Sequence, residues 1–265
     1  MLKASSGVIF LSAMAFSVAV SANASESYMS IGGEYFNWEE NVDYKDDTFV
    51  SEYGPKIVYE RGENNWWTKT QGRLDSSHMK VKLGYVSYHG GSKKYGLENI
   101  KGDTYYYDLE YFKGLGYRQE VSESFAIDYK GYIGVKNWYR WIDAGTHDSP
   151  VTGESEDIGA YEIYLGAFSK AGIGFKIKES LYLEAGVNYP VFVAEYSNSE
   201  ENDDLIYPEA DIGYYADITY RVNNSIFVKA YYEESNFKRS DNNDSNFYQP
   251  KSESSVSGIS VGKWF

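Results

Sequence analysis

The 265-residue chain contains no cysteine. This absence excludes a disulfide framework, a thiol nucleophile, a cysteine-ligated zinc site and a lipoprotein anchor. Basic residues are also scarce, because 25 Lys and Arg stand against 39 Asp and Glu, which gives a net charge of −14. Nucleic-acid binding needs clustered basic side chains that neutralise phosphates, so the sequence argues against a nucleic-acid partner.

Long apolar runs are missing from most of the chain, and the exception is a run of 14 residues over 7–20. Lys3 precedes this run, and the small residues Ala22 and Ala24 follow it. The pattern is typical of a secretory signal peptide, and the run is too short to cross a bilayer as a helix. We therefore expect a signal peptide over residues 1–24 and one domain over residues 25–265, which could cross a membrane only with strands.

What the chain has in quantity is aromatic residues, including 28 Tyr, arranged with a period of two. In residues 125–141, for example, Ile127 and Tyr129 alternate with Asp128 and Lys130. Successive strand side chains point to opposite faces, so this alternation predicts strands with one apolar and one polar face. The same alternation recurs in residues 158–177, 181–195 and 208–222.

The alternating segments predict ten strands, separated by connections that are short at one end and long at the other. The expected strands cover residues 28–40, 51–61, 66–88, 104–118, 125–143, 158–177, 181–197, 208–222, 226–238 and 254–265. Short turns are expected near 62–65, 119–124, 178–180 and 223–225, and longer loops near 41–50, 89–103, 144–157, 198–207 and 239–253. Residues 66–88 alternate poorly around Gly72 and Asp75, so eight or twelve strands remain alternatives.

This pattern predicts an all-β fold, a single closed antiparallel up-and-down transmembrane β-barrel. A soluble β-sandwich or lipocalin-like barrel would alternate in the same way, with its apolar residues inside. The expected strands are 12 or more residues long in most cases, which suits a tilted crossing of about 9–11 residues better than globular strands of about 5–6. Tyr and Trp near strand ends would then form interfacial girdles.

The chain ends in Trp264 and Phe265, and here it resembles the Gram-negative outer-membrane barrels. The last strand of these proteins ends in Phe, which the barrel-assembly machinery reads, so the resemblance implies that Phe265 is an assembly signal. It also implies an outer-membrane location and contact with lipopolysaccharide. The ten-stranded omptin proteases and Opc-type adhesins are similar in size.

Inside such a barrel the polar faces of the strands would meet. Ten acids and ten bases fall on these faces, which predicts a charge-balanced network of ion pairs, because buried charges must be paired. An ion-selective pore would show an excess of one sign, and a ten-stranded barrel is narrow, so we expect a largely filled lumen. The residues expected to carry this network are Glu34, Asp108, Glu110, Arg118, Asp128, Lys130, Arg140, Glu162, Glu184, Asp211, Asp217, Arg221 and Lys229.

The negative excess falls largely on the expected long loops. Acidic runs occur in residues 43–47, 148–157, 200–204 and 241–244. Solvated charge is the ordinary explanation for such runs. Divalent cations shared with lipopolysaccharide are an alternative, because Ca²⁺ and Mg²⁺ prefer oxygen ligands. Otherwise we expect no cofactor.

The sequence offers little for catalysis. Its three histidines are His78, His89 and His147, and only the last has an acid, Asp148, beside it in a long loop. The omptins use paired Asp residues and an Asp–His couple near the extracellular rim, and their motifs are not matched here. We therefore expect no catalytic residue and no enzyme activity.

The sequence favours a protein of the cell surface that acts in interaction, adhesion or envelope integrity through its loops, which carry function on barrel scaffolds. An extracellular protein or glycan would be the ligand. A narrow porin-like channel for small solutes is the first alternative. An omptin-like protease or a lipid-modifying outer-membrane enzyme is the second.

Overall fold

The computed structural model describes residues 26–41, 48–92, 97–148, 153, 155–199, 202–240 and 250–265. The expected signal peptide and most of the acidic loop residues lie outside these ranges. No helix among the described residues is long and apolar enough to cross a membrane.

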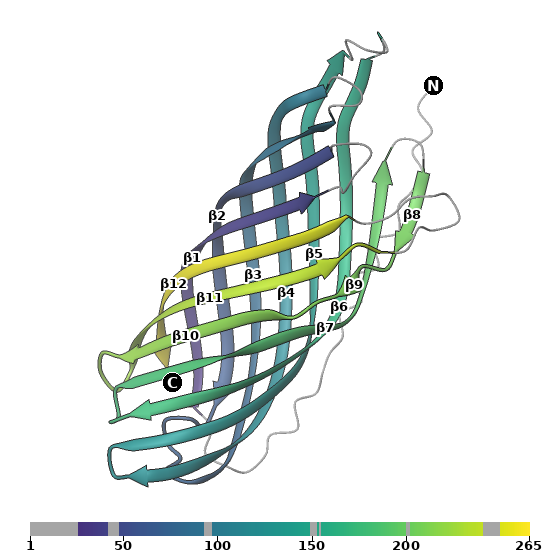
Figure 1. Ribbon diagram of the computed structural model, residues 1–265. Helices are drawn as coiled ribbons and strands as arrows, with labels where there is room; N and C mark the ends of the chain where they lie inside the picture. The colour runs from purple at the N-terminus through teal and green to yellow at the C-terminus, as the bar shows by residue number, and fades with distance from the viewer. Residues whose placement is uncertain are drawn as a thin grey trace.

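Twelve strands make up nearly all of the described chain (Figure 1). They are β1 (Glu26–Asn41), β2 (Thr48–Asn64), β3 (Gly72–Ser92), β4 (Leu97–Ser122), β5 (Phe125–Asp148), β6 (Ser155–Ile177), β7 (Leu181–Ser199), β8 (Asn202–Ile206), β9 (Glu209–Ala210), β10 (Gly213–Arg221), β11 (Ile226–Lys238) and β12 (Lys251–Trp264).

Ten of these strands form one closed antiparallel ring. Each strand from β1 to β7 pairs with its neighbour in sequence, β10 pairs with both β7 and β11, and β12 pairs with both β11 and β1. The short strands β8 and β9 lie outside the ring, where β8 pairs with β7 and β9 pairs with β11. The predicted ten-stranded all-β barrel is therefore confirmed.

The register shows how steeply the strands slope around the ring. A row of paired residues leaves β3 at Gly72, passes through Arg118 and Asp128, and circles through β10, β12 and β1. It returns to β3 at Gly84, 12 residues further along the strand. Such a stagger requires the strands to tilt by roughly 40° from the barrel axis. The row rises from the short-turn end toward the loop end, and half a circuit corresponds to six residues.

Alternation sorts side chains between the lumen and the outer face. On β1, Glu34 and Phe36 are buried in the lumen, whereas Ile31 and Tyr35 are 64% and 55% exposed on the outside. The other strands of the ring repeat this division, so the outer face is mainly aliphatic and aromatic. The sequence pattern predicted this distribution, in which the apolar side chains face outward.

The connections differ from the predicted ones in two ways. Residues 65–71 do not belong to a strand, and β3 begins only at Gly72, whose φ of 94° lies in the region that favours glycine. At the other end, strands run well into the predicted loops: β3 and β4 cover most of residues 89–103, and β8 lies within 198–207.

A β-bulge in β7 reverses the faces that strict alternation assigns. Pro190 and Phe192 pair with adjacent residues of β6, which leaves Val191 as an extra residue. As a result Phe192 is 51% exposed and Val193 is buried, the opposite of the predicted faces. Glu195 consequently points into the lumen and is buried.

Candidate functional site in the barrel lumen

Three layers of charged side chains fill the lumen, and we name them by height. The lower layer lies at the short-turn end and contains Arg118, Asp128, Lys130, Glu184, Glu60, Lys80, Asp217 and Lys229. The middle layer contains Glu34, Lys82, Glu110, Lys56, Asp108, Lys136, Glu233 and Lys170. The upper layer contains Arg140, Glu40, Glu52, Glu162 and Glu195.

Arg118 organises the lower layer and is fully buried. Its Nε and Nη2 donate to the two oxygens of Asp128, both at 2.6 Å, in a bidentate pair. Its Nη1 donates to the backbone carbonyl oxygens of Trp66 and Lys69, the latter at 2.7 Å. One guanidinium thus joins the barrel wall to the turn over residues 65–71.

This turn folds into the barrel and closes its short-turn end. Trp67 is buried among Tyr28, Tyr182, Phe227 and Trp264 in an aromatic cluster. Trp66 stacks on Tyr182, with ring centroids 5.4 Å apart, and Lys176 donates from Nζ to the Trp67 carbonyl oxygen at 2.9 Å. We call residues 65–71 the plug. The poor alternation of this segment in the sequence reflects its role as a plug.

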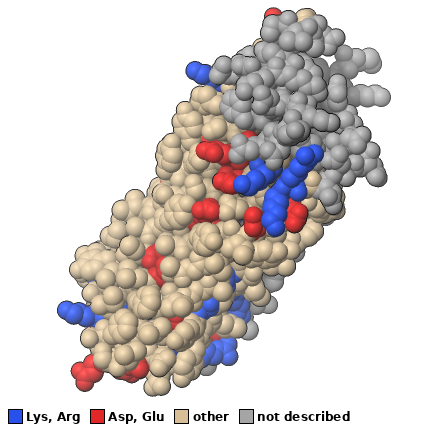
Figure 2. Space-filling model, viewed as in Figure 1, with Lys and Arg blue, Asp and Glu red and all other residues tan. Residues whose placement is uncertain are grey.

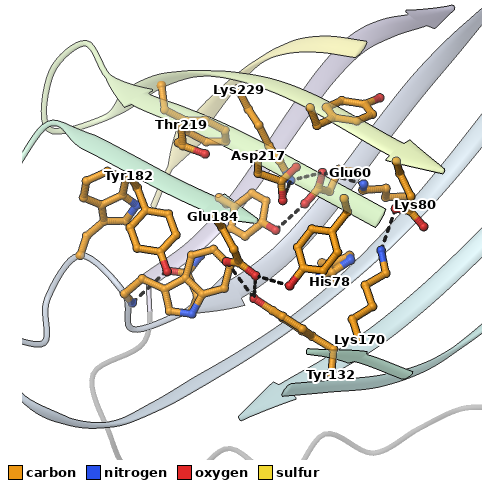
Figure 3. Close-up of a pocket in the computed structure, with 18 of the residues that line it drawn as sticks. Glu60, His78, Lys80, Tyr132, Lys170, Tyr182, Glu184, Asp217, Thr219 and Lys229 are labelled. Atoms are coloured by element: carbon orange, nitrogen blue, oxygen red, sulfur yellow. Dashed lines mark hydrogen bonds and ion pairs between the residues drawn. The ribbon is translucent and has the colours of Figure 1, made fainter. Parts of the chain in front are cut away.

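Above the plug lies a cavity of about 60 Å³, enough for a few water molecules. Figure 3 shows Glu60, Lys80, Glu184 and Lys229 converging on this space from different strands. Three side chains hold Glu184: Lys130 donates from Nζ at 2.8 Å, and the hydroxyls of Tyr132 and Tyr215 both donate at 2.9 Å. The cavity is therefore polar, and fixed ion pairs line it.

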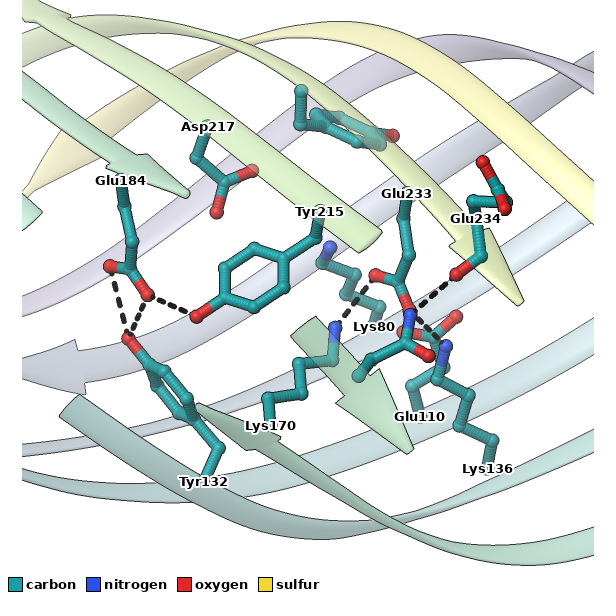
Figure 4. Close-up of polar contacts among 12 residues, drawn as sticks. Lys80, Glu110, Tyr132, Lys136, Lys170, Glu184, Tyr215, Asp217, Glu233 and Glu234 are labelled. Carbon is teal, nitrogen blue, oxygen red and sulfur yellow. Dashed lines mark hydrogen bonds and ion pairs between the residues drawn. The ribbon is translucent and has the colours of Figure 1, made fainter. Parts of the chain in front are cut away.

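The middle layer crosses the lumen from wall to wall. Lys136 and Lys170 of β5 and β6 both donate to Glu233 of β11, the latter at 2.7 Å (Figure 4). Lys82 of β3 bridges Glu34 at 3.3 Å and Glu110 at 2.8 Å. All of these charged side chains are nearly or completely buried, so the pairs form a partition between the two ends of the lumen. Lys56 and Asp108, 2.9 Å apart, complete the layer.

Aromatic and aliphatic side chains fill most of the remaining space. A cluster that includes Phe36, Tyr106, Phe112 and Phe168 packs around the middle layer and reaches the upper layer. The ammonium group of Lys56 lies 3.6 Å from the centre of the Phe36 ring, a cation–π contact. A second cavity of about 60 Å³ lies beside this cluster. Glu233 borders both cavities and stands between them.

The upper layer gathers several carboxylates around one cation. Arg140 pairs with Glu40 at 2.8 Å, Glu52 at 3.2 Å and Glu162 at 2.8 Å. Neutral donors also stabilise these carboxylates, because the hydroxyls of Thr104 and Tyr106 both donate to Glu52. This layer carries a negative excess, whereas the other two layers pair acids with bases in equal numbers.

The structure places most of the sequence-predicted residues inside the barrel and in ion pairs. These are Glu34, Asp108, Glu110, Arg118, Asp128, Lys130, Arg140, Glu162, Glu184, Asp217, Arg221 and Lys229. Asp211 differs, because the predicted strand over 208–222 is interrupted there. Its carboxylate accepts from the neighbouring Ile212 N–H at 2.9 Å and forms no ion pair with a described residue.

The sequence prediction missed several lumenal residues, so its charge balance does not hold in the upper layer. Glu52, Lys56 and Glu60 alternate with Tyr53, Ile57 and Tyr59, and this alternation indicates that the three charged side chains point inward. The missed acids of the upper layer are Glu40, Glu52 and Glu195.

The histidines lie apart from one another. His78 lies in the lumen and stacks on Phe112, with ring centroids 5.6 Å apart. His89 stacks on Tyr53, an exposed residue of the outer face. The structure does not describe the side chain of His147. Within the described ranges, no group of three or more His, Asp or Glu is arranged to hold a metal ion.

No protein-family model matches the chain, and no curated protein matches its sequence. Comparison with solved structures does find similar folds. The outer membrane protease OmpT from Escherichia coli matches with a TM-score of 0.58 at 9% identity, over 91% of this chain and 96% of that chain. The chain has the fold of an outer-membrane β-barrel.

Two weaker matches are barrels of other kinds. The attachment invasion locus protein Ail of Yersinia pestis has a TM-score of 0.35 at 14% identity, over 91% of this chain and 98% of that chain. The translocator domain of the autotransporter NalP from Neisseria meningitidis has a TM-score of 0.45 at 10% identity, over 92% and 90%. At these identities the likeness concerns architecture, so activity has to be argued from the lumen and the outer face.

Proposed function

We propose that this outer-membrane-type barrel resides in the outer membrane, conducts no solutes, and serves surface interaction or envelope integrity through its loop end. The observation that carries the proposal is the middle layer of the lumen. There, Glu233 joins Lys136 and Lys170 across the barrel, and Lys82 joins Glu34 and Glu110. Because separating buried ion pairs is costly, these contacts oppose the passage of water and ions.

The plug supports the same conclusion at the short-turn end of the lumen. A solute entering from the short-turn end would have to displace Trp66 and Trp67 and break the contacts of Arg118 with two backbone carbonyls. The barrel therefore has two closures in series, each built from different residues.

The outer face supports the location. Apolar side chains such as Ile31, Ile57 and Ile133 are 64–72% exposed around the ring, an arrangement that is unfavourable in water. Exposed aromatic residues border this surface, as Tyr117 and Tyr220 do near the short turns. This surface fits a hydrocarbon layer between two aromatic girdles.

The closed lumen is tested by swelling of proteoliposomes in solutions of small sugars. The wild-type protein is expected to give no more swelling than empty liposomes. The matched control is a variant in which Lys136, Lys170 and Glu233 are replaced by Ala and residues 66–70 are deleted, which removes both closures. Swelling by the wild type at the rate of that variant would contradict the proposal and favour the small-solute channel.

The role of the loop end is tested in cells that produce either the wild type or a variant with Asn and Gln in place of the loop acids in residues 43–47, 148–157, 200–204 and 241–244. Adhesion to proteins and glycans, and sensitivity to detergent, are compared with and without divalent cations. We expect the variant to lose adhesion or barrier strength. Equal behaviour of the two strains in both assays would contradict a role for these loops.

A further inference from the structure

The boundary between apolar and polar residues on the outer face runs obliquely around the barrel. On β11, the outward series from Ile226 to Tyr232 is apolar, and the next outward residue is Glu234. On the opposite wall, β4 remains apolar or aromatic much further toward the loop end, up to Tyr105, which is 43% exposed.

The strand register shows which residues of β4 and β11 lie at the same height along the barrel axis. Leu109 of β4 belongs to a row of paired residues that runs backward through β3, β2, β1 and β12 and reaches β11 at Val228. These five steps are half a circuit, so the row has descended by six residues. Glu234, six residues above Val228, therefore lies at the height of Leu109 on the opposite wall.

The same offset appears near the short-turn end. Four residues below Leu109 lies Lys113, and four residues below Glu234 lies Ala230, so these two also share a height. Lys113 is exposed and forms no ion pair with a described residue. Arg61, on β2, is likewise exposed and unpaired within the described chain. At the upper of these two heights, β11 is charged (Glu234) and β4 is apolar (Leu109). At the lower height, β4 is charged (Lys113) and β11 is apolar (Ala230).

Backbone pairing gives a second, independent indication. β7 pairs with β10 only from Leu181 to Asn188, and β10 begins at Gly213. Beyond this point the described residues 189–194 of β7 have no strand partner on that side, and pairing resumes with β8 at Glu195. Lipid-exposed backbone that lacks partners does not occur in the hydrocarbon core, so the core must end near Gly213 on this wall.

On the opposite wall, lipid-compatible side chains extend higher. Tyr85, Tyr105 and Trp141 form a contiguous exposed aromatic group, with ring centroids 5.1 and 5.5 Å apart. In Figure 2, which faces the wall of β10 to β12, acidic and basic side chains gather toward the loop end above a largely uncharged surface. The two walls thus indicate different heights for one membrane boundary.

We propose that the barrel axis is tilted in the bilayer, so that the membrane midplane crosses β4 near Leu109 and β11 near Ala230. The inference rests on the proposed membrane location. The midplane is then displaced by four residues between the two walls, which corresponds to roughly 10 Å along the barrel axis. The bilayer surfaces then meet Glu234 on the low wall and Lys113 on the high wall.

The tilt also explains the uneven rim. Strands β5 and β6 reach far beyond β10 at the loop end (Figure 1). In an upright barrel this rim would be strongly slanted. In the tilted barrel the long wall and the short wall end at similar distances from the membrane surface, so the loop end presents a more level face to the exterior.

The absence of cysteine makes the test direct. Single-cysteine variants L109C, E234C, K113C and A230C carry an environment-sensitive probe in phospholipid vesicles, and its depth is measured with quenchers placed at headgroup and acyl positions. The tilted orientation predicts deep probes at positions 109 and 230 and shallow probes at positions 234 and 113. Equal depth within each matched-height pair would overturn the tilt.

A control pair lies on the walls midway between the high and low walls. Tyr59 of β2 shares the row of Leu109, and Val187 of β7 lies at the same height as Tyr59 on the facing wall. Variants Y59C and V187C are expected to report similar depths, and a large difference would contradict the proposed tilt direction. Water-exposed probes at all six positions would overturn membrane insertion itself, whereas equal depths within the bilayer would overturn only the tilt. Heat-dependent migration in SDS gels confirms that each variant is folded.

Discussion

The barrel buries two arginines, Arg118 and Arg140, toward opposite ends of its lumen, and their partners differ. Arg118 pairs with a single carboxylate, that of Asp128, and its Nη1 donates to two backbone carbonyl oxygens of the plug. Arg140 pairs with three carboxylates and is the only cation among the described residues of the upper layer. The lower arginine therefore fixes a segment of chain, whereas the upper one compensates charge.

This difference predicts that loss of a charged side chain has different consequences at the two ends of the lumen. At the lower end, the charges are matched, and loss of one of them releases a local segment. At the upper end, three acids depend on one base, so loss of that base leaves several buried charges without compensation. Substitution of each arginine separates these effects, and substitutions in the middle layer and on the outer face extend the comparison; the expected magnitudes decrease in the order given.

The largest effect is expected for Arg140→Met. It leaves Glu40, Glu52 and Glu162 buried without a cation, which should lower the free energy of unfolding by at least about 3–5 kcal/mol. Urea unfolding in vesicles, followed by tryptophan fluorescence, measures this loss. Glu162→Gln is the control and should cost much less, because Arg140 keeps two partners. Equal losses for the two variants would contradict the compensating role of Arg140.

Arg118→Met should destabilise by about 3 kcal/mol, and its consequence should be local. Asp128 keeps the hydroxyl of Tyr182 at 2.8 Å, which limits the loss. The plug is expected to loosen, which limited proteolysis within residues 65–71 and the fluorescence of Trp66 and Trp67 can detect. Arg118→Lys preserves the charge but not the forked geometry, so its plug should be intermediate. If the plug of Arg118→Met resisted proteolysis as well as that of the wild type, Arg118 would not be the residue that holds the plug.

Glu233→Gln is expected to cost about 2 kcal/mol, because a neutral amide oxygen replaces a charged acceptor for two lysines. Lys136 and Lys170 would then lie near each other without their shared anion. The free energy of unfolding in vesicles measures this effect. Glu234→Gln is the matched control, since Glu234 lies next in sequence on the outer face. If the control were the more destabilising variant, the middle layer would not be a structural partition.

Lys113→Leu should have the smallest effect, a change below about 1 kcal/mol. In the tilted barrel, Lys113 lies at the membrane surface, where a lysine costs little. Near the midplane, its removal would instead stabilise the protein by roughly 2–4 kcal/mol. Unfolding in vesicles distinguishes the two values, and Ala230→Lys on the low wall is the reciprocal test, with a clear loss of stability expected.

The sequence predicted the ring of strands and most of its inward charges because both depend on local alternation. Glu34 and Arg140 were assignable from their strands alone. Alternation failed at Glu195, because the bulge at Val191 shifts the face of every later residue in β7. It also failed at Asp211, where the strand is interrupted.

The partners of the charged residues could not be predicted from local patterns. Arg140 and Glu40 are 100 residues apart in sequence, and Lys136 and Glu233 are 97 apart. These distances close only when β10 joins β7 and β12 joins β1, so stagger and closure decide which acid meets which base. The plug was hidden for a related reason: a turn that folds into the lumen has no periodic signal.

The most direct test of the closed lumen is single-channel recording of the purified full-length barrel in planar bilayers. The wild type is expected to give no steady conductance steps, and the variant lacking the plug and carrying Ala at positions 136, 170 and 233 is expected to give them. Large, steady steps from the wild type would contradict the account, because a lumen crossed by buried ion pairs cannot carry a steady ionic current.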